Sequence, residues 1–89
     1  MAVLVIAEVE GVTAKMHEEM LTQLAEPCRQ AKGFIGHLGG PHAGAFRVFE
    51  IWDTKEDATQ FFARFVHPNL PPGVRPKRTF HELSAVLLK

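Results

Sequence analysis

A carboxylate and an indole lie two residues apart near the end of the segment from Gly44 to Asp57, which has the pattern of a strand followed by a helix. Alternate side chains of a strand share a face, so Glu50 and Trp52 should point the same way, on an otherwise apolar face. Burial there would raise the pKa of the Glu50 carboxyl toward neutrality and suit it to general acid or base chemistry. Glu50 could instead pair with an arginine or reach solvent at the sheet edge. Trp52, the only tryptophan, could pack in the core.

Histidines are the other candidates for proton transfer, because their side chains titrate near neutral pH. His17 shares a helical face with Leu24 and could point into a cavity or be a half-buried core residue. His37 lies in a short predicted strand and His81 near the start of the last one, so either could reach a cavity, depending on strand register. His67 precedes a proline, where it could line a cavity mouth or act as a favourable cation at a helix end.

The spacing of these groups does not predict a metal site. His37 and His42 are five residues apart across a glycine-rich turn, and no Asp or Cys completes a set of ligands. Cys28 is the single cysteine, which excludes an internal disulfide framework and fits a reducing cytoplasm. The glycine-rich turn also lacks the strand-to-helix context of a phosphate-binding loop.

Composition narrows the class of protein. The chain has 89 residues, enough for one domain, with 46% hydrophobic residues and a formal net charge of zero. Zero net charge gives no general attraction to nucleic acid or to an anionic membrane. The apolar N-terminal residues lack a preceding basic region and are followed by Glu8, so they predict a strand rather than a signal peptide. No apolar run approaches the ~20 residues of a membrane span. We expect a soluble cytoplasmic protein.

The first half of the chain predicts a strand, a helix and a second strand. Residues 2–9 are rich in Val and Ile and apolar on both faces, as in a strand buried within a sheet. Thr13 should cap a helix that runs to about Lys32, with Pro27 kinking it or ending it early. Residues 34–38 form a short strand, and the turn-rich residues 39–44 predict a hairpin with the strand that follows.

The second half predicts a helix and a last strand. Thr54 should cap a helix from about Lys55 to Val66, with Asp57 completing a capping pattern. The phenylalanines of this helix, Phe61 and Phe65 among them, share one face. We expect them to pack mainly in the core and secondarily to line a substrate cavity. A proline-rich linker spans residues 67–78; its basic end could meet an acidic ligand at a pocket mouth or be a solvated loop. Residues 79–88 predict the last strand.

The order strand, helix, strand, strand, helix, strand is that of the split βαβ or ferredoxin-like motif. It predicts an α+β fold with one four-stranded antiparallel sheet and both helices on one face. Because the strands carry apolar residues on both faces, we expect the other face to be covered by the same face of a second copy, giving a two-fold homodimer.

The chain resembles the antibiotic-biosynthesis-monooxygenase-like (ABM-like) family of the dimeric α/β barrel superfamily. The resemblance rests on AVLVIAEV at residues 2–9, GFIGHLGGP at 33–41, RVFEIWDTKEDATQFF at 47–62 and FHEL at 80–83. Family members bind hydrophobic small molecules in a cavity between sheet and helices. They include cofactor-independent oxygenases of aromatic polyketides, haem-degrading enzymes and related polyketide cyclases.

The sequence departs from the family pattern at three places. The oxygenases and haem degraders use an Asn on the first strand together with the Trp, whereas residues 7–9 contain none and the only Asn is Asn69 in the linker. Haem degradation also requires a histidine ligand on the second helix, where His67 sits only at the end. Many members carry a His midway along this helix, where this chain has Phe61. The resemblance therefore implies an apolar pocket and argues against haem degradation.

We thus expect a natural-product-pathway enzyme, a cofactor-independent oxygenase or a cyclase/isomerase, acting on a hydrophobic aromatic or polyketide-like small molecule without a metal or other cofactor. The alternative is a non-catalytic small-molecule-binding or accessory dimeric protein; neither class needs a nucleic-acid or membrane partner. The predicted proton-transfer residues are Glu50, His17, His37 and His81, and the predicted substrate-binding residues are Trp52, Phe61, Phe65, His67 and Leu24.

Overall fold

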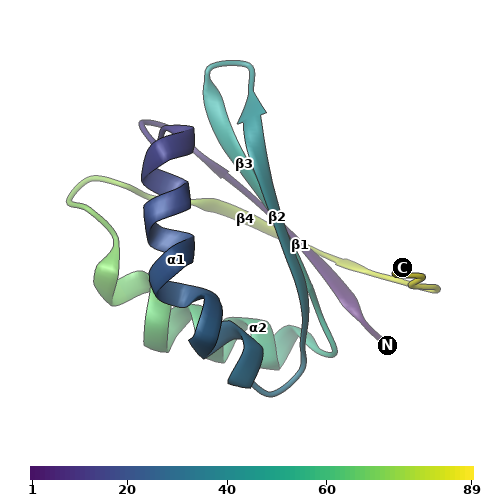
Figure 1. The fold of residues 1–89 in the computed structure, drawn as a ribbon. Coiled ribbons are helices and arrows are strands. Elements are labelled where there is room, and N and C mark those ends of the chain that lie inside the picture. Colours follow the sequence, from purple (N-terminus) through teal and green to yellow (C-terminus); the bar gives the residue numbers. More distant parts are fainter.

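One antiparallel sheet carries both helices on the same side (Figure 1). The computed structural model describes residues 1–89. The strands are ordered β2-β3-β1-β4 in the sheet, which confirms the predicted α+β, ferredoxin-like fold. The elements are β1 (Val3–Val9), α1 (Ala14–Gln30), β2 (Phe34–His42), β3 (Ala45–Trp52), α2 (Lys55–Phe61) and β4 (Lys77–Glu82).

The central strand β1 sets which side chains face the helices. It pairs antiparallel with β3 on one side and with β4 on the other, so that Val5 lies opposite both Glu50 and Phe80. Its side chains alternate between the two faces of the sheet, and the four buried ones point toward the helices: Val3, Val5, Ala7 and Val9. A slip of one residue would turn this apolar row to the other face, so burial fixes the register.

Helix α1 begins as predicted but ends differently. The Thr13 hydroxyl accepts a hydrogen bond from the Met16 amide at 3.1 Å, which confirms it as the N-cap. Of the two predicted effects of Pro27, the early end is wrong, because the helix continues to Gln30. Pro27 lies in the last turn, where its missing amide removes only one helical hydrogen bond, and the neighbouring Cys28 is buried against the sheet. Packing of that turn outweighs the lost bond.

The hairpin between β2 and β3 is longer than predicted. Strand β2 extends past residue 38 to His42, and only Ala43 and Gly44 form the turn. Both turn residues have positive φ, 49° and 80°, as a two-residue type I′ turn requires. The glycines counted as loop are therefore paired with β3, and Gly39 lies opposite Val48.

The second helix is also capped as predicted, since the Asp57 amide donates to the Thr54 hydroxyl at 3.0 Å. Its regular part ends at Phe61, earlier than expected, and continues as a π turn (Phe62–Val66) and a 3-10 turn (His67–Asn69). Strand β4 starts within the predicted linker, at Lys77, and ends at Glu82. The predicted strand to Leu88 is therefore wrong in its second half, and Leu87 and Leu88 are exposed.

The core lies between the sheet and the two helices. Trp52 is fully buried, and its ring centroid lies 5.3 Å from those of both Phe34 and Phe61. Both contacts are tilted or edge-on, the geometries that aromatic pairs prefer. The core cluster consists of Val3, Val5, Cys28, Trp52, Ala58 and Phe61. Neither helix combines the length and apolar character needed to cross a membrane.

The cap of α2 can be tested by removing one hydroxyl. Thr54→Ala should lower the free energy of unfolding by about 1 kcal/mol, because the Asp57 amide loses its acceptor. Urea unfolding followed by circular dichroism measures the change. Thr59→Ala, at an exposed position inside the same helix, is the matched control and should leave stability equal or slightly raised. Equal effects of the two variants would contradict the capping assignment.

Candidate active site

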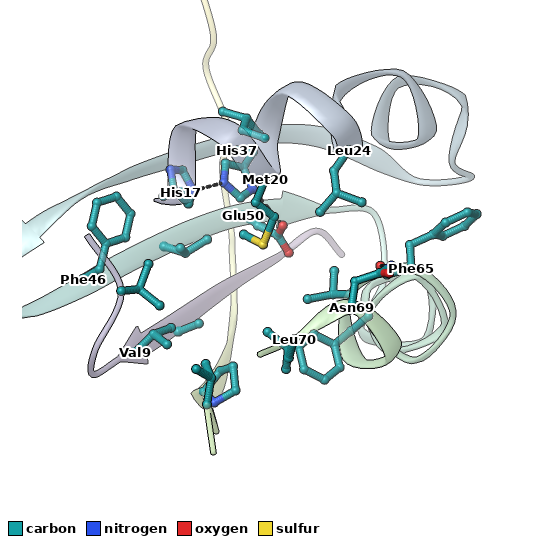
Figure 2. A pocket seen from close by; sticks show the side chains of 18 of the residues that line it. Val9, His17, Met20, Leu24, His37, Phe46, Glu50, Phe65, Asn69 and Leu70 are labelled. Atoms are coloured by element: carbon teal, nitrogen blue, oxygen red, sulfur yellow. Dashed lines mark hydrogen bonds and ion pairs between the residues drawn. The ribbon is translucent and has the colours of Figure 1, made fainter. Parts of the chain in front are cut away.

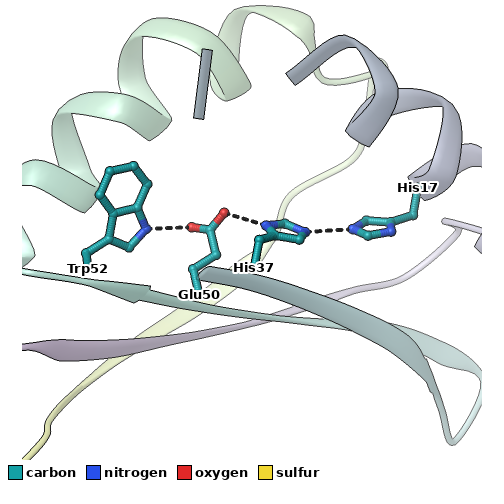
Figure 3. A network of polar contacts seen from close by, with 4 residues as sticks. All are labelled: His17, His37, Glu50 and Trp52. Carbon is teal, nitrogen blue, oxygen red and sulfur yellow. Dashed lines mark hydrogen bonds and ion pairs between the residues drawn. The ribbon is translucent and has the colours of Figure 1, made fainter. Parts of the chain in front are cut away.

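A chain of side-chain hydrogen bonds runs across the helix-facing side of the sheet (Figure 3). The indole Nε1 of Trp52 donates to Glu50 Oε1 at 3.1 Å. The other carboxylate oxygen, Oε2, lies 2.8 Å from Nδ1 of His37. Nε2 of His37 in turn lies 2.9 Å from Nε2 of His17. The carboxylate is thus bound at both oxygens, and the chain ends in the imidazole of His17.

Three elements position this chain. Glu50 and Trp52 are two residues apart on β3 and share its helix-facing side, as predicted. The hairpin register places His37 of β2 directly opposite Glu50. His17 comes from the first half of α1 and is only 7% exposed. The structure therefore brings together three of the four predicted proton-transfer residues.

Gly39 provides the space for the His17 imidazole and the Phe46 ring. A Cβ at this position would lie 2.9 Å from Cε1 of His17 and 2.9 Å from Cε1 of Phe46. Real Cβ atoms do not approach that closely, so any larger residue would displace the His17 ring. The His17 ring also packs against Phe46, with a centroid distance of 4.5 Å. The position of the His17 ring therefore depends on the small size of Gly39 and on its packing against Phe46.

The hydrogen bonds define where the protons lie. A carboxylate only accepts, so the Glu50 contact places a proton on Nδ1 of His37. Nε2 of a neutral His37 is then an acceptor, and His17 donates to it through its own Nε2. Nδ1 of His17 is left with a free lone pair. When a proton is accepted there, the proton on Nε2 can pass to His37, where it meets the charge of Glu50.

The electrostatics of the chain favour a neutral His17 and an ionised Glu50. Burial and the neighbouring His37 lower the pKa of His17 below 6.5, although Glu50 partly opposes them. Burial alone would raise the pKa of Glu50. The hydrogen bond and charge of His37, the indole donor of Trp52 and the charge of Arg78 outweigh it, and the pKa falls below 4.5. The predicted rise toward neutrality is therefore wrong, because the carboxylate is paired.

The chain borders a cavity of about 330 Å³ between the sheet and the helices (Figure 2). His17, His37 and Glu50 all line it, and 17 of its 26 lining residues are hydrophobic. Its volume lies in the range of small-molecule sites. Three of the residues predicted to contact substrate also line it: Leu24, Phe61 and Phe65.

The other predicted site residues lie elsewhere. Trp52 has no exposed surface and does not line the cavity, because Phe34 and Phe61 enclose its ring. His67 is exposed at the 3-10 turn and does not line the cavity. His81 lies opposite Leu4 on the sheet face away from the helices, where its ring pairs with the Thr79 hydroxyl at 2.9 Å. The alternation of β4 turns His81 away from the cavity.

The cavity wall contains three polar residues that the sequence analysis did not single out, Glu19, Gln23 and Asn69. It also contains Arg78, which belonged to the basic linker end expected either to meet an acidic ligand at a pocket mouth or to be solvated. Asn69, in the 3-10 turn, lines the cavity while its Nδ2 donates to the Phe65 carbonyl at 2.8 Å. Arg78 lines it from β4, with its guanidinium carbon 3.9 Å from the Phe62 ring centroid. The alternation of Arg78 with Phe80 was the available signal, but the prolines before it indicated a linker.

No group of three His, Cys, Asp or Glu side chains is arranged to hold a metal ion. Cys28 lines the cavity as a thiol rather than a thiolate, because burial and the charge of Glu50 raise its pKa to about 11. A thiol of this kind is a poor nucleophile at neutral pH. The other polar side chains that line the cavity are those of His17, Glu19, Gln23, His37, Glu50, Asn69 and Arg78.

Known structures share this architecture. SnoaB, a cofactor-independent oxygenase from Streptomyces nogalater, superposes with a TM-score of 0.66 over 99% of this chain and 98% of SnoaB, at 11% identity. A protein from Deinococcus radiodurans, proposed to be an antibiotic biosynthesis monooxygenase, gives a TM-score of 0.62 at 19% identity over 98% of this chain and 97% of its own. PA3566 from Pseudomonas aeruginosa gives 0.56 at 19% identity over 92% and 95%.

The chain has the ABM-like fold. The similarity covers nearly the whole of each chain, so it concerns the complete arrangement of sheet and helices rather than one motif. At these low identities the similarity establishes the fold and leaves the chemistry to the residues of the cavity. No protein-family model and no curated protein sequence matches this chain.

The shifted pKa values predict that acid destabilises the protein in two stages. The folded His17 has a pKa below its ordinary 6.5, so unfolding takes up a proton and stability falls as the pH drops below 6.5. Glu50 adds a second loss below 4.5, where the unfolded chain binds a proton that the folded chain still excludes. Urea midpoints measured from about pH 8 to about pH 3 record both stages.

The control separates His17 from the other histidines. His17→Gln should remove the first stage and keep the second, while His42→Gln, at an exposed hairpin position, should keep both. A wild-type midpoint that stays constant from about pH 6.5 down to about pH 5 would disprove the assignment to His17.

Proposed function

We propose that the protein is an enzyme that removes a proton from an acidic carbon of a hydrophobic aromatic or polyketide-like molecule, as a cofactor-independent oxygenase or a cyclase/isomerase. The observation that carries this proposal is the hydrogen-bonded chain of Glu50, His37 and His17 in the wall of an apolar cavity. Its fold, shared with the cofactor-independent oxygenase SnoaB, supports the same class of chemistry.

His17 is the base in this proposal. Its free Nδ1 takes the proton, the carbon–hydrogen bond breaks, and the electron pair stays on the substrate, delocalised into its carbonyl and aromatic system. The proton on Nε2 can pass to His37, whose positive charge then faces the ionised Glu50 at 2.8 Å. His37 and Glu50 are only 10% and 14% exposed at their side chains, so this attraction is weakly screened. The relay stabilises the charge that proton removal creates.

The residues that line the cavity help to distinguish an oxygenase from a cyclase or isomerase. Both begin with the same carbanion, which reacts with oxygen in an oxygenase and with an internal carbonyl or a returning proton in a cyclase or isomerase. The first strand supplies only the apolar Val5, Ala7 and Val9 to the cavity, without the Asn that the family's oxygenases use there. This difference favours the cyclase or isomerase. A non-catalytic binding protein would use the same cavity without needing the relay.

Proton removal can be measured directly, before any choice between these chemistries. The wild-type protein should catalyse exchange of deuterium from D2O into the acidic CH2 of 2-tetralone, a hydrophobic bicyclic ketone, followed by proton NMR. His17→Gln should slow this exchange by about 100-fold, because a general base contributes a factor of this size. Glu50→Gln should slow it by about tenfold or more, because the relay loses its negative charge.

The controls separate catalysis from binding. His42→Gln, at an exposed position, should exchange at the wild-type rate. Oxygen uptake with an aromatic polyketide substrate identifies the oxygenase, and product formation without uptake identifies the cyclase or isomerase. Binding of 2-tetralone with no exchange above the buffer rate would reject the enzyme and leave the binding protein.

We further propose that a second copy covers the open face of the sheet, as expected from the sequence. This face points away from both helices (Figure 1), and Leu38 on it is 61% exposed. The strand registers place five apolar side chains there: Leu4, Ile6, Leu38, Phe49 and Ile51. Open apolar faces of this extent are typical of interaction surfaces.

A charge in the middle of that face should prevent association. Ile6→Glu should convert a dimer into a monomer in native mass spectrometry at micromolar concentration, because two carboxylates would be buried without partners. Thr59→Glu, on the exposed side of α2, is the control and should remain dimeric. A monomeric wild-type protein under these conditions would contradict the proposed homodimer.

A further inference from the structure

Arg78 is the only Lys or Arg among the residues that line the cavity. Its guanidinium carbon lies 3.9 Å from the ring centroid of Phe62 and 5.2 Å from that of Phe80. The two rings cover the cation and remove water from it. Arg78 therefore presents a partly desolvated positive charge on the β4 side of an otherwise apolar space.

This cation lacks a hydrogen-bond acceptor. Its Nη2 is buried from solvent and has no hydrogen-bond partner. Glu50 is the carboxylate that attracts it electrostatically, but its two oxygens are already bound by His37 and Trp52. Buried charges in proteins are normally paired, and a guanidinium has five donors to satisfy. Arg78 thus has a donor available for an anion.

We propose that Arg78 binds a carboxylate of the ligand, so that the cavity prefers a hydrophobic aromatic acid to a neutral aromatic molecule of the same shape. A carboxylate fits a guanidinium with two parallel hydrogen bonds, the strong and orienting arrangement that neutral oxygen groups do not provide. This inference rests on the proposed function only in taking the cavity as the substrate site, and it names the class of substrate.

The sheet register places this anion site away from the base. Arg78 is opposite Ala7, and Glu50 is opposite Val5, on the two different neighbours of β1. Two strand spacings and a two-residue offset separate their backbones by roughly 12 Å. A ligand held by its carboxylate at Arg78 therefore extends across β1 toward His37 and the base. The carboxylate orients the molecule, and the acidic carbon lies at its other end.

The experiment compares two ligands of nearly equal shape, 2-naphthoate and 2-naphthamide, by isothermal titration calorimetry at neutral pH. The wild-type protein should bind the acid at least about tenfold more tightly than the amide, because only the acid is charged. Arg78→Met should bring the ratio of the two affinities close to one and leave amide binding within about threefold of wild type. Arg78→Lys keeps the charge without the planar fork and should give an intermediate ratio.

A second variant keeps this inference separate from the proposed function. His17→Gln should lose proton exchange while retaining the preference for the acid. Equal binding of acid and amide by the wild-type protein, or a preference that persists in Arg78→Met, would overturn the role of Arg78. If circular dichroism shows that Arg78→Met does not fold, the acid-to-amide affinity ratios of the wild-type protein and of Arg78→Lys test the role of Arg78 instead. An Arg78→Lys ratio equal to the wild-type ratio would contradict the two parallel hydrogen bonds. Preference for the acid without proton exchange would reject the enzyme but not the anion site.

Discussion

The site depends on one constraint, a carboxylate that is buried and must have both oxygens satisfied. Glu50 meets it with the indole of Trp52 on one oxygen and His37 on the other. Each donor follows from backbone geometry, since Trp52 is two residues along the same strand and His37 is directly opposite across the hairpin. An ionised carboxyl in an apolar layer would otherwise be too costly to keep. The paired carboxylate then fixes which nitrogen of His37 carries a proton, and through it the tautomer of His17.

This arrangement explains why a tryptophan predicted to contact substrate lies in the core. Its ring fills the space between the sheet and α2, while its one polar atom reaches the carboxylate. A buried indole needs an acceptor, and Glu50 supplies it. Trp52 therefore positions Glu50 and stabilises the fold at the same time. Its effect on chemistry would act through the hydrogen-bonded chain rather than through contact with a ligand.

Short-range patterns made much of the fold predictable. The element order, both helix caps and the shared face of Glu50 and Trp52 follow from local sequence, because capping and strand alternation act over a few residues. The pairing of His37 with Glu50 was not predictable, since it depends on a two-residue turn at Ala43 and Gly44 that extends β2. The glycines before that turn resembled a loop. They are strand residues, and Gly39 among them leaves room for the His17 ring.

The last strand shows the same limit. The sequence analysis assigned Arg78 to a proline-rich linker and placed His81 among the proton-transfer residues. The register of β4 with β1 instead turns Arg78 toward the cavity and His81 toward the opposite face of the sheet. The face that each residue takes depends on which side chain of β1 it opposes, and this pairing spans most of the chain. A shift of one residue would have placed His81 inside and Arg78 outside. The sequence pattern predicted that side chains of β4 alternate between the two faces of the sheet, but not which of them face the helices.

The lowered pKa of Glu50 changes which polar group is suited to act as the base. A carboxyl with a pKa near neutrality would have been suited to act as the base itself, whereas the lowered pKa of Glu50 makes its carboxylate a weaker base. In the proposed mechanism, this negative charge lies 2.8 Å from His37, the residue to which His17 passes its proton. Arg78 is left on the far side of β1 as a cation without a hydrogen-bonded anion. The proposed base and the proposed anion site thus lie on different strands of the cavity wall, so a ligand that bears both an acidic carbon and a carboxylate would satisfy the two in a single orientation.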